Sequence, residues 1–556
     1  MRRRFRLAGL FPVVCGVSLA LAAPAPPKAP AKAVRAAEGV SSESRQATRA
    51  AMDVLAAGGN AIDAAVTAAL VAGVTSPSSS GLGGGGFALV YLAAERKTTI
   101  LDFREVAPRA LDAAAFERRP LPEAERGKLV GVPGEPAGLH ELHRRHGKRA
   151  WRDLVAPAER LARGGFVVEA HLAGALSTAA KTQVHSDAAL SAVYFPGSKP
   201  AIAGQRLTNP KLARTLGRLK NEGPKALYQG EIANDLVARA RELGGALALE
   251  DLTAYRVLER TPLVARWEGL EVVTMPPPSA GGILLAEVLG IFTREELAAA
   301  GTDKPLGIHL LAEAMRGAFA DRACCVGDPD VVATDVTKLL APARLARRKR
   351  MISADRTHLV QRFVDNLHGT HHLVTADREG NVVSLTTTVN TTFGADAAAE
   401  KSGIVLNDEL DDFTANADAA KLGVKDNPNA ARPGARPVSS MTPTIVFRDG
   451  RPVVAIGGSG GTTIAPNVAQ VLLSVLVRGV PPAEAVNAPR FAPISRDATL
   501  LLDADFGDVV QKELVYRGEI LKVTPRIPFG VQLLFWGEKG LEGGADPRKH
   551  GLAEVR

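Results

Sequence analysis

The sequence predicts one large mixed α/β domain, helix-rich in its first part and strand-rich in its second. From about residue 130 to residue 345, apolar residues recur at helical spacing between Pro, Gly and Asn-Pro boundaries. From Thr370 onward, runs of β-branched and apolar residues bounded by turn residues are typical of strands. No internal repeat is visible, so a repeat array is not indicated. A chain of 556 residues is long enough to bury a large core.

The first 22 residues have the pattern of a secretory signal peptide. Four arginines form a basic head, an apolar run follows, and Ala20-Leu21-Ala22 offers a small-x-small cleavage site. The run is too short for a membrane span. Cys15 follows bulky valines, which argues against a lipoprotein, and the arginines match a twin-arginine signal only weakly. We therefore expect export to the periplasm or the extracellular space, by a route that stays open, and no membrane span in the mature protein.

Residues 23–40 are rich in Pro, Ala and Lys and predict a flexible linker. The segment from Ser41 has a capping signal followed by helical apolar spacing, and it leads to the glycine run Gly81–Gly86 and the strand-like FALVYLA. The run satisfies G-x-G-x-x-G, but a dinucleotide site needs a strand before it and a helix after it. The order here is reversed, so we interpret the run as tightly packed backbone.

Charge and cysteine content argue against two further classes of protein. The formal net charge is +9, and it falls by four to +5 when the arginines of the signal are removed. Aromatic residues make up only 4% of the chain, too few for the interleaved basic and aromatic surface of a nucleic-acid-binding protein. Only Cys324 and Cys325 lie beyond the signal, and adjacent cysteines rarely bridge each other. We predict two buried, unlinked cysteines on a helix and no disulfide framework.

Three histidines cluster in NLHGTHHLVTADREGNVVSLTTTVN (366–390), which predicts a β-hairpin that turns near Glu379. His368, His371 and His372 are candidate metal ligands. Side chains at adjacent strand positions point to opposite faces, however, and no Asp, Glu or Cys lies at a ligand spacing beside them. We therefore predict no metal site and interpret the histidines as the start of a strand.

Thr370, between Gly369 and His371, is the more informative residue. A hydroxyl nucleophile needs a base, and an N-terminal threonine can use its own α-amino group. The reference pKa of such a group is about 7.7–8.0, which suits a base at neutral pH. Cutting the Gly369–Thr370 bond would create it, and the glycine leaves its carbonyl open to attack by the threonine hydroxyl. The predicted hairpin places Thr388 and Asn390 beside Thr370.

The sequence Gly457-Gly458-Ser459-Gly460-Gly461 follows the apolar strand PVVAI and precedes the helix TTIAPNVAQVLL. This context matches the nucleophile elbow G-x-S-x-G of α/β-hydrolases, with Ser459 as nucleophile. Such an enzyme needs a later histidine, and only His550, near the C-terminus, is present. The alternative is that backbone N–H groups at this glycine-rich helix start hold an oxyanion.

Together these features resemble the γ-glutamyltransferase family of the N-terminal-nucleophile hydrolase superfamily. The resemblance covers roughly Gly39 to Arg548, and its motifs occur in the family's order: SGLGGGGFALVYL, LDFREVAPRA, GVPGEPAGLHEL, YRVLERTPL, MPPPSAGGI, ADRACCVGDPD, GTHHLV, NTTFG, SGIVLNDELDDF, RPVSSMTPTIV, GGSGGTTI, NAPRF and GADPR. It implies an α/β (α+β) fold, the four-layer αββα sandwich. It also implies a precursor cut at Gly369–Thr370 into a large subunit, residues 41–369, and a small catalytic subunit, residues 370–556, which together form one globule.

The resemblance assigns roles to residues within these motifs. The catalytic group comprises the nucleophile, a supporting threonine and two oxyanion-binding glycines: Thr370, Thr388, Gly460 and Gly461. The substrate group binds the amino-acid end of a γ-glutamyl compound. Arg104, Ser439 and Ser440 are assigned to its α-carboxylate. Asp412 is assigned to its α-amino group, with Glu409 and Asn390 beside it. The implied reaction cleaves the γ-glutamyl amide of glutathione and transfers the acyl group, through a threonine acyl-enzyme, to water or to amino-acid and peptide acceptors. No metal or organic cofactor is implied.

Two alternatives remain: a β-lactam or glutaryl acylase of the same superfamily, and an inactive exported binding protein on the same scaffold. Retention of both Arg104 and Asp412 favours a substrate with an amino-acid head, and an intact Thr370 favours an enzyme. Two motifs depart from the family pattern. The segment between Asp412 and Ser439 has no Tyr or Trp, which predicts a more open pocket. The loop GGSGG lacks the usual proline but keeps both donor glycines.

Overall fold

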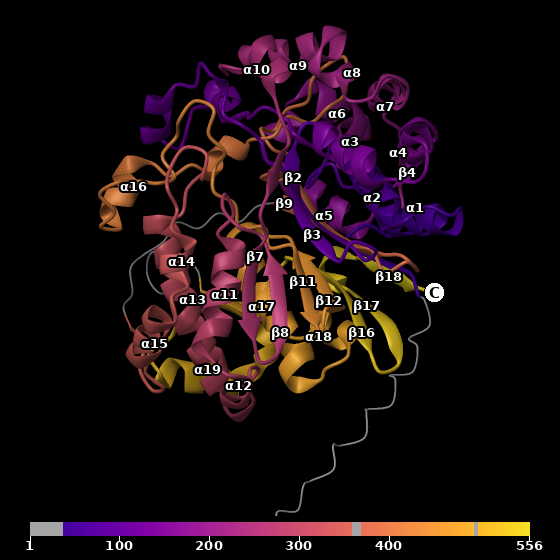
Figure 1. Cartoon of the computed structure of the whole chain (residues 1–556). Coiled ribbons are helices and arrows are strands. Elements are labelled where there is room, and N and C mark those ends of the chain that lie inside the picture. The colour runs from indigo at the N-terminus through magenta and orange to yellow at the C-terminus, as the bar shows by residue number, and fades with distance from the viewer. Residues whose placement is uncertain (1–36, 359–368, 494–498) are drawn as a thin grey trace, which may run out of the picture. The chain divides into compact units, whose positions relative to one another are not determined.

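The computed structural model describes residues 37–358, 369–493 and 499–556. The predicted signal peptide, residues 23–36 of the predicted linker and His368 lie outside the described residues. Within them, two antiparallel sheets face each other, and strands β9 (Gly369–Ala376) and β10 (Val382–Asn390) of one contact β12 (Arg451–Gly458) of the other (Figure 1).

The first sheet has seven strands in the order β18-β1-β9-β10-β2-β3-β6. Its remaining strands are β1 Gly39–Ser42, β2 Gly85–Leu92, β3 Lys97–Phe103, β6 Leu258–Arg260 and β18 Leu552–Val555. The second sheet has six strands in the order β17-β16-β12-β11-β8-β7. Its remaining strands are β7 Leu263–Trp267, β8 Leu270–Thr274, β11 Thr444–Arg448, β16 Val531–Gly537 and β17 Gly540–Ala545.

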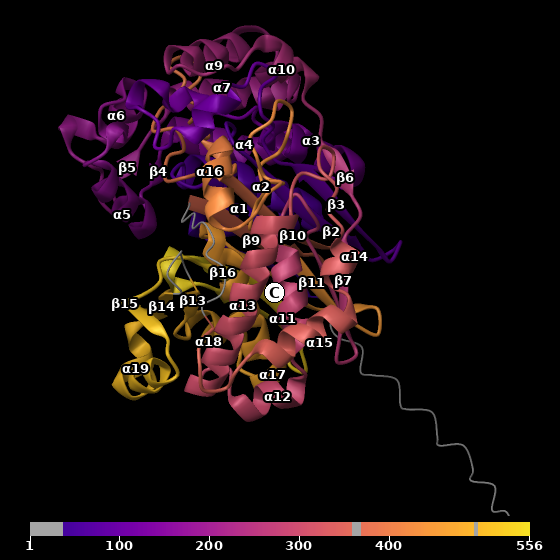
Figure 2. The same cartoon turned by 90° about the vertical axis from the view of Figure 1, so that its left-hand side faces the viewer.

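Helices cover the outer face of each sheet (Figure 2). On the first sheet lie α1 Arg45–Ala56, α2 Ala61–Thr75 and α3 Glu135–His146; on the second lie α11 Gly281–Ile291 and α17 Ile464–Arg478, with α13 Pro305–Cys325 packed on α11. The predicted four-layer αββα sandwich is therefore confirmed.

The other helices are α4 Trp151–Gly164, α5 Ala170–Ala179, α6 Ala188–Tyr194, α7 Pro210–Glu222, α8 Lys225–Tyr228, α9 Gly230–Glu242, α10 Leu249–Ala254, α12 Arg294–Ala300, α14 Val336–Leu339, α15 Pro342–Met351, α16 Asn416–Lys421, α18 Pro482–Asn487 and α19 Gly507–Tyr516. The smaller sheets comprise β4 Phe166–Val167 with β5 Arg206–Leu207, and β13 Phe491–Pro493 with β14 Thr499–Asp503 and β15 Ile520–Thr524.

The β9–β10 hairpin lies at the centre of the first sheet and every residue of both strands is buried. Successive side chains alternate between its faces, so that Val374 packs in the core between the sheets and Leu373 in the core under the helices. Its turn is held by the Asp377 carboxylate, which accepts the N–H groups of Glu379 and Asn381 at 2.9 and 3.0 Å. The predicted register is confirmed, with Thr388 directly opposite Thr370.

Both sheets combine strands from before and after Gly369. In the first sheet β9 lies between β1 and β10, and β10 in turn pairs with β2. In the second sheet β8 pairs with β11. A cut at the start of β9 would therefore leave two polypeptides that still share hydrogen bonds in both sheets and a common core.

The middle of the chain is dominated by helices, as predicted, but it also contains β6, β7 and β8, which are only three to five residues long. One prediction near the N-terminus is wrong. Strand β1 begins at Gly39, so Gly39 and Val40 belong to the first sheet and not to a flexible linker. In the described part of the chain, no helix has both the length and the apolar character needed to cross a bilayer.

The prediction for the cysteines is also wrong. Cys324 and Cys325 form a disulfide with each other at the end of α13, and both are half-buried. The helix ends at Cys325 and Val326 is extended, so the backbone at this point is released from helical geometry on one side. Inside a helix, the side chains of neighbouring residues point in directions too far apart to bond. At the end of α13 this restriction is relaxed, so the two sulfur atoms can meet.

Candidate active site

Thr370 is the second residue of β9 and only 3% exposed, and its side chain lies on the face directed at the second sheet. The hydroxyl of Thr388 donates a hydrogen bond to the carbonyl oxygen of Gly369 at 3.0 Å and accepts one from the N–H of Asn390 at 2.8 Å. The hydroxyl oxygens of Thr370 and Thr388 are 3.5 Å apart. A β-bulge between Thr388 and Asn390 allows these contacts. The carbonyl before Thr370 is therefore polarised beside a hydroxyl that can attack it.

Close packing of the backbone fixes this arrangement. A Cβ on Gly369 would lie 2.7 Å from the carbonyl oxygen of Ser78, so no larger residue fits before Thr370. A Cβ on Gly84 would lie 1.9 Å from the carbonyl oxygen of Thr388. The glycine run Gly81–Gly86 thus lets β2 approach β10 closely, which confirms its interpretation as tightly packed backbone.

Arg104 directly follows β3 and is 1% exposed. Its guanidinium donates to Glu409, to Asp412 at 2.6 Å and to the carbonyl of Pro437 at 3.2 Å. Glu409 and Asp412 begin and end a single 3₁₀ turn, where residues three apart lie on the same side. This explains why both carboxylates reach one arginine. The three contacts use three of the five N–H donors of the guanidinium, so two remain for a ligand.

One cation faces three carboxyl groups here. Burial alone lowers the pKa of Arg104, but Glu409, Asp412 and Glu105 outweigh it, so the pKa of the guanidinium is raised. Burial raises the pKa of Glu105 to about 8, against the effect of Arg104. Burial likewise raises the pKa of Glu409 well above its usual value, and Glu105 and Asp412 raise it further. Burial and the neighbouring carboxyl groups thus favour the protonated form of Glu105 and Glu409, whereas Arg104 favours their ionised form.

Ser439 and Ser440 lie on a loop clamped against the MPPPSAGG segment. The N–H of Ser439 donates to the carbonyl of Pro278 at 2.9 Å, and the N–H of Ala280 donates to the carbonyl of Ser439 at 2.9 Å. The hydroxyl of Ser439 accepts the N–H of Met441 at 3.0 Å. These bonds hold both serines beside Arg104, whose guanidinium binds the same loop at Pro437.

The glycine loop after β12 has the geometry of a helix start. Gly460 and Gly461 have φ angles of +123° and +59°, and a Cβ on Gly460 would lie 2.3 Å from the ring of Phe529. Gly461 opens the helical turn that leads into α17, where backbone N–H groups have no partner within the helix. Ser459 is completely buried, and its hydroxyl accepts the N–H of Gly530 at 3.4 Å. Ser459 is also absent from the lining of the cavity that contains Thr370, which argues against Ser459 as the nucleophile.

One small cavity brings the predicted site together. It is lined by every residue predicted to be catalytic or substrate-binding except Gly460: Arg104, Thr370, Thr388, Asn390, Glu409, Asp412, Ser439, Ser440 and Gly461. Four lining residues were not predicted, namely Arg322, Met441, Thr462 and Ile464. All four belong to motifs of the family resemblance, and Arg322, from ADRACCVGDPD, is the only charged one.

The cavity measures about 20 Å³, room for about one water molecule. The more open pocket expected from the lid sequence stays a prediction for the mature protein. A larger cavity of about 480 Å³ shares Arg322 and Asp412 with it and is also lined by Leu121, Leu129 and Phe413.

Comparison with known proteins decides the family. A family model described as gamma-glutamyltranspeptidase matches residues 47–555. The chain belongs to the gamma-glutamyltranspeptidase family. Glutathione hydrolase 2 of Arabidopsis thaliana is 37% identical over 531 residues, 90% of each chain. The glutathione hydrolase proenzyme of Escherichia coli K12 is 34% identical over 98% of this chain and 97% of the relative. A solved structure of cephalosporin acylase from Bacillus halodurans has a TM-score of 0.83 and 26% identity, covering 96% of this chain and 98% of that chain.

The histidines of this gamma-glutamyltranspeptidase are structural neighbours of Thr370. His372 lies against Gly457 of β12 and exchanges a 2.8 Å hydrogen bond with Thr386, whereas His371 points to the opposite face of β9. Burial lowers the pKa of each to about 3, so both are neutral at physiological pH. Within the described ranges, no group of three or more His, Cys, Asp or Glu side chains is arranged to hold a metal ion.

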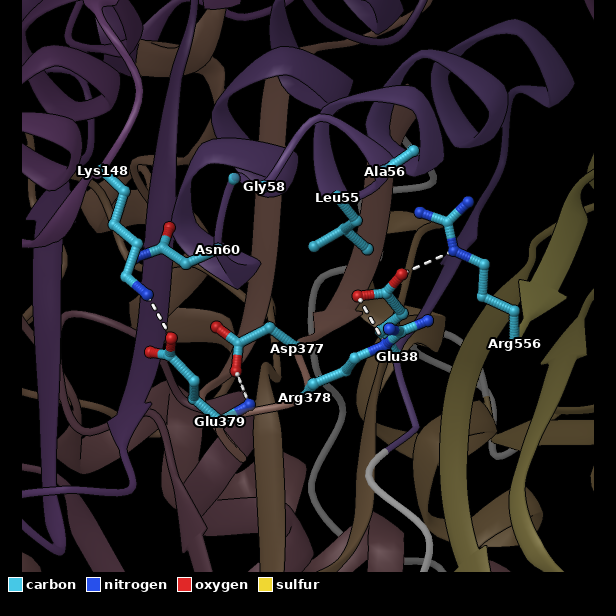
Figure 3. Close-up of a pocket in the computed structure, with 11 residues that line it drawn as sticks. Glu38, Leu55, Ala56, Gly58, Asn60, Lys148, Asp377, Arg378, Glu379 and Arg556 are labelled. Carbon is cyan, nitrogen blue, oxygen red and sulfur yellow. Dashed lines mark hydrogen bonds and ion pairs between the residues drawn. The ribbon is translucent and has the colours of Figure 1, made fainter.

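A second pocket of about 470 Å³ lies at the far end of the same hairpin (Figure 3). Its charged side chains pair with one another: Glu38 with Arg378 and Arg556, and Lys148 with Glu379. An eight-residue strand separates it from Thr370, a distance of about 24 Å at 3.4 Å per residue. It therefore plays no part in the chemistry at Thr370.

Glu135, at the start of α3, gives the gamma-glutamyltranspeptidase fold a pH-dependent stability. Burial raises the pKa of its carboxyl to about 8. Between the unfolded pKa near 4.5 and pH 8 the folded state binds more protons than the unfolded state, so stability falls as pH rises through this window. We expect Glu135→Gln to lie close to the wild type at pH 5 and to exceed it by about 4 kcal/mol at pH 9 in denaturant unfolding.

Glu141 on the same helix is the matched control. Its carboxylate binds Arg144 and Arg145, which lower its pKa to about 2, so it is ionised at both pH values. Glu141→Gln should therefore change stability by a similar amount at pH 5 and pH 9. If the effect of each substitution on the free energy of unfolding is the same at pH 5 and pH 9, Glu135 does not hold its proton in the folded protein.

Proposed function

We propose that this protein is an exported, self-cleaving γ-glutamyltransferase and glutathione hydrolase. The observation that carries the proposal is the hydrogen bond from Thr388 to the Gly369 carbonyl, next to the hydroxyl of Thr370. Family membership supports it, since relatives across the whole chain are named glutathione hydrolases. After removal of the signal peptide, the mature form consists of residues 23–369, which comprise the linker and the large subunit, and residues 370–556, the small subunit.

Maturation starts from the uncut chain. The oxygen of the Thr370 hydroxyl attacks the carbonyl carbon of Gly369, and the Thr388 hydroxyl stabilises the negative charge that develops on the carbonyl oxygen. The C–N bond breaks, the acyl group moves to the threonine oxygen as an ester, and the nitrogen becomes the α-amino group of Thr370. Water then hydrolyses the ester and releases the Gly369 carboxylate.

Removing the Thr388 hydroxyl should slow this cleavage. We expect Thr388→Val to lengthen its half-time by about 10²-fold, the usual cost of one lost oxyanion donor. Thr388→Ser keeps the donor and should cleave at nearly the wild-type rate. Cleavage is followed by denaturing gel electrophoresis after expression.

Thr387 supplies the control for Thr388→Val. It is the adjacent residue on β10, equally buried, and its hydroxyl bonds to Ser80 at 2.7 Å on the opposite face of the sheet. Thr387→Val should therefore cleave normally. If both valine variants mature equally fast, the Thr388 hydroxyl has no role in the cleavage.

Acyl transfer then uses the same atoms in the mature protein. Arg104 with Ser439 and Ser440 binds the α-carboxylate of the donor, while Asp412, with Glu409 and Asn390 beside it, binds its α-amino group. The Thr370 hydroxyl attacks the γ-carbonyl as its α-amino group takes the proton, and the N–H groups of Gly460 and Gly461 hold the oxyanion. Cysteinylglycine leaves into the larger cavity beyond Asp412, and water or an acceptor amine resolves the ester.

The cephalosporin acylase neighbour supports a second candidate, an acylase acting on glutaryl or β-lactam amides. A glutaryl group has the carboxylate but lacks the α-amino group of a glutamyl head. The buried pair Glu409 and Asp412 is then superfluous, which is why we favour the γ-glutamyl donor.

One experiment tests the proposal. Purified protein should run as two bands on a denaturing gel, the smaller beginning at Thr370 by N-terminal sequencing, and should hydrolyse γ-glutamyl anilide faster than glutaryl anilide. The larger fragment from the periplasm should begin at Ala23 if the signal is removed there. A single uncut band without turnover would overturn the proposal, and preference for the glutaryl substrate would favour the acylase.

A further inference from the structure

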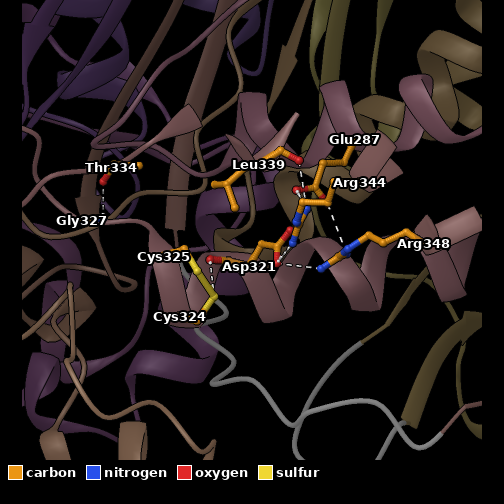
Figure 4. The surroundings of a disulfide bond; sticks show 9 residues. All are labelled: Glu287, Asp321, Cys324, Cys325, Gly327, Thr334, Leu339, Arg344 and Arg348. Atoms are coloured by element: carbon orange, nitrogen blue, oxygen red, sulfur yellow. Dashed lines mark hydrogen bonds and ion pairs between the residues drawn. A yellow bond between two sulfur atoms is a disulfide. The ribbon is translucent and has the colours of Figure 1, made fainter. Parts of the chain in front are cut away.

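The disulfide between Cys324 and Cys325 has no role in the chemistry above (Figure 4). The pair forms the end of α13, and both residues are partly accessible to solvent. Beyond Cys15 in the predicted signal, they are the only cysteines of the chain. A disulfide that solvent reaches is open to attack by a thiolate.

One side of the pair contacts the substrate-binding loop. Cys325 packs against an apolar cluster that includes Ala280 and Val438. Val438 immediately precedes Ser439, and Ala280 donates its N–H to the Ser439 carbonyl at 2.9 Å. Arg322, one turn earlier on α13, lines the catalytic cavity itself. The end of α13 therefore buttresses the loop proposed to bind the donor carboxylate.

On its other side, the pair lies one helical turn beyond residues of α13 that line a basic cavity of about 600 Å³. Gly317, Ala320 and Asp321 of α13 line it, and Cys324 continues this row because residues three or four apart share a helix face. The sulfur of Cys324 is 3.6 Å from the carbonyl oxygen of Asp321. The carboxylate of Asp321 binds Arg344 at 2.5 Å, as Figure 4 shows.

Two further arginines of α15, Arg347 and Arg348, line the same cavity. Arg348 binds Asp321 at 2.7 Å. Arg347 is exposed, and among the described residues none pairs with its guanidinium. The cavity next to the end of α13 thus offers an exposed cation, which suits a small thiol that carries a carboxylate.

We propose that Cys324–Cys325 is an exchange site for small peptide thiols that carry a carboxylate, the class that includes glutathione and cysteinylglycine. This inference rests on the proposed function in one respect only: the proposed reaction would release such a thiol beside α13. A thiolate attacks the sulfur of Cys324, the disulfide breaks, and Cys325 leaves as a thiolate that takes a proton. A second thiolate attacks the small-molecule sulfur of the mixed disulfide and releases Cys324. Two thiols are oxidised to one disulfide while the protein disulfide is reduced to two thiols.

Exchange acts on the enzyme through the loop at Ser439. Reduction removes the bond that fixes the last residue of α13 against Ala280 and Val438, so the loop loses part of its support. We expect the KM for γ-glutamyl anilide to rise about fivefold in the reduced protein, at the lower end of typical coupling between two sites. The value of kcat should stay within about twofold, because Thr370 and its neighbours on β10 are unaffected.

The test measures exchange separately from turnover. The mature protein is treated with cysteinylglycine, free thiols are trapped with iodoacetamide, and peptide mapping reports the state of Cys324 and Cys325. Without thiol, neither cysteine should be alkylated; with it, both should be, by way of a mixed disulfide. Alkylation of both cysteines before any thiol is added, or a disulfide that resists millimolar thiol in the folded protein, would overturn the proposal. Exchange in a protein without turnover would refute the proposed function alone.

Two controls address charge and coupling. At matched thiolate concentration, cysteinylglycine should react about fivefold faster than neutral 2-mercaptoethanol, and Arg347→Ala should remove this preference. A Cys324→Ser/Cys325→Ser double variant should show a KM that thiols do not change. Equal rates for both thiols with the wild type would contradict a preference for carboxylate-bearing thiols, and a KM unchanged by reduction would contradict the coupling to Ser439.

Discussion

Replacing Thr370 by alanine should leave the chain uncut and without γ-glutamyl transfer. The hydroxyl is the attacking group in both steps, and the α-amino base does not exist until the Gly369–Thr370 bond is broken. We expect a single band on a denaturing gel and a loss of at least about 10⁴-fold in kcat with γ-glutamyl anilide, typical of a lost nucleophile. Because Thr370 is only 3% exposed and the change removes few atoms, the variant should still unfold cooperatively.

Two further variants decide between a chemical and a structural effect. Thr370→Ser keeps the hydroxyl and should mature and turn over, though more slowly. Thr178→Ala removes an exposed hydroxyl that donates to the Gly174 carbonyl of its own helix, and it should behave as the wild type. An alanine variant at position 370 that still yields two fragments would place the cleavage chemistry on another residue.

The hairpin around Thr370 was predictable because local rules determine it. Alternation of side chains sets which residues face the second sheet, and the Asp377–Gly380 turn sets where the chain reverses. Counting outward from that turn along the two strands is enough to place Thr388 opposite Thr370. The positions of Arg104 and Asp412 relative to Thr370 depend instead on how distant strands and loops pack, and only the family resemblance supplied them.

The features that sequence analysis missed have weak or misleading local signals. Strands β6 to β8 are only three to five residues long, so the helical segments on either side outweigh them. Arg322 resembles any other arginine on a helix, and its place in the cavity depends on a distant contact, the hydrogen bond that it donates to the Val438 carbonyl at 3.3 Å. The bridge between Cys324 and Cys325 depends on where α13 ends, which is the least predictable property of a helix.

Replacing Arg104 by lysine should raise the KM for γ-glutamyl anilide by about 10²-fold, within the range for a disrupted buried charge pair. An ammonium group keeps the charge but cannot bridge Glu409, Asp412 and the Pro437 carbonyl with one planar fork. Cleavage before Thr370 should persist, since the hydrogen bond to the Gly369 carbonyl comes from β10. Arg109→Lys, an exposed arginine five residues further on, is the control and should leave KM unchanged.

Asp412 then separates recognition of the carboxylate from recognition of the amino group. In Arg104→Lys, γ-glutamyl and glutaryl anilides should lose binding together, because both carry the carboxylate. Asp412→Asn keeps the shape of the side chain but removes the charge that the α-amino group needs, so only the γ-glutamyl substrate should lose affinity. Equal losses on both substrates would mean that Asp412 acts only by holding Arg104, at 2.6 Å, in place. The preference for an amino-acid head would then have to come from Glu409, the other carboxylate on the same 3₁₀ turn.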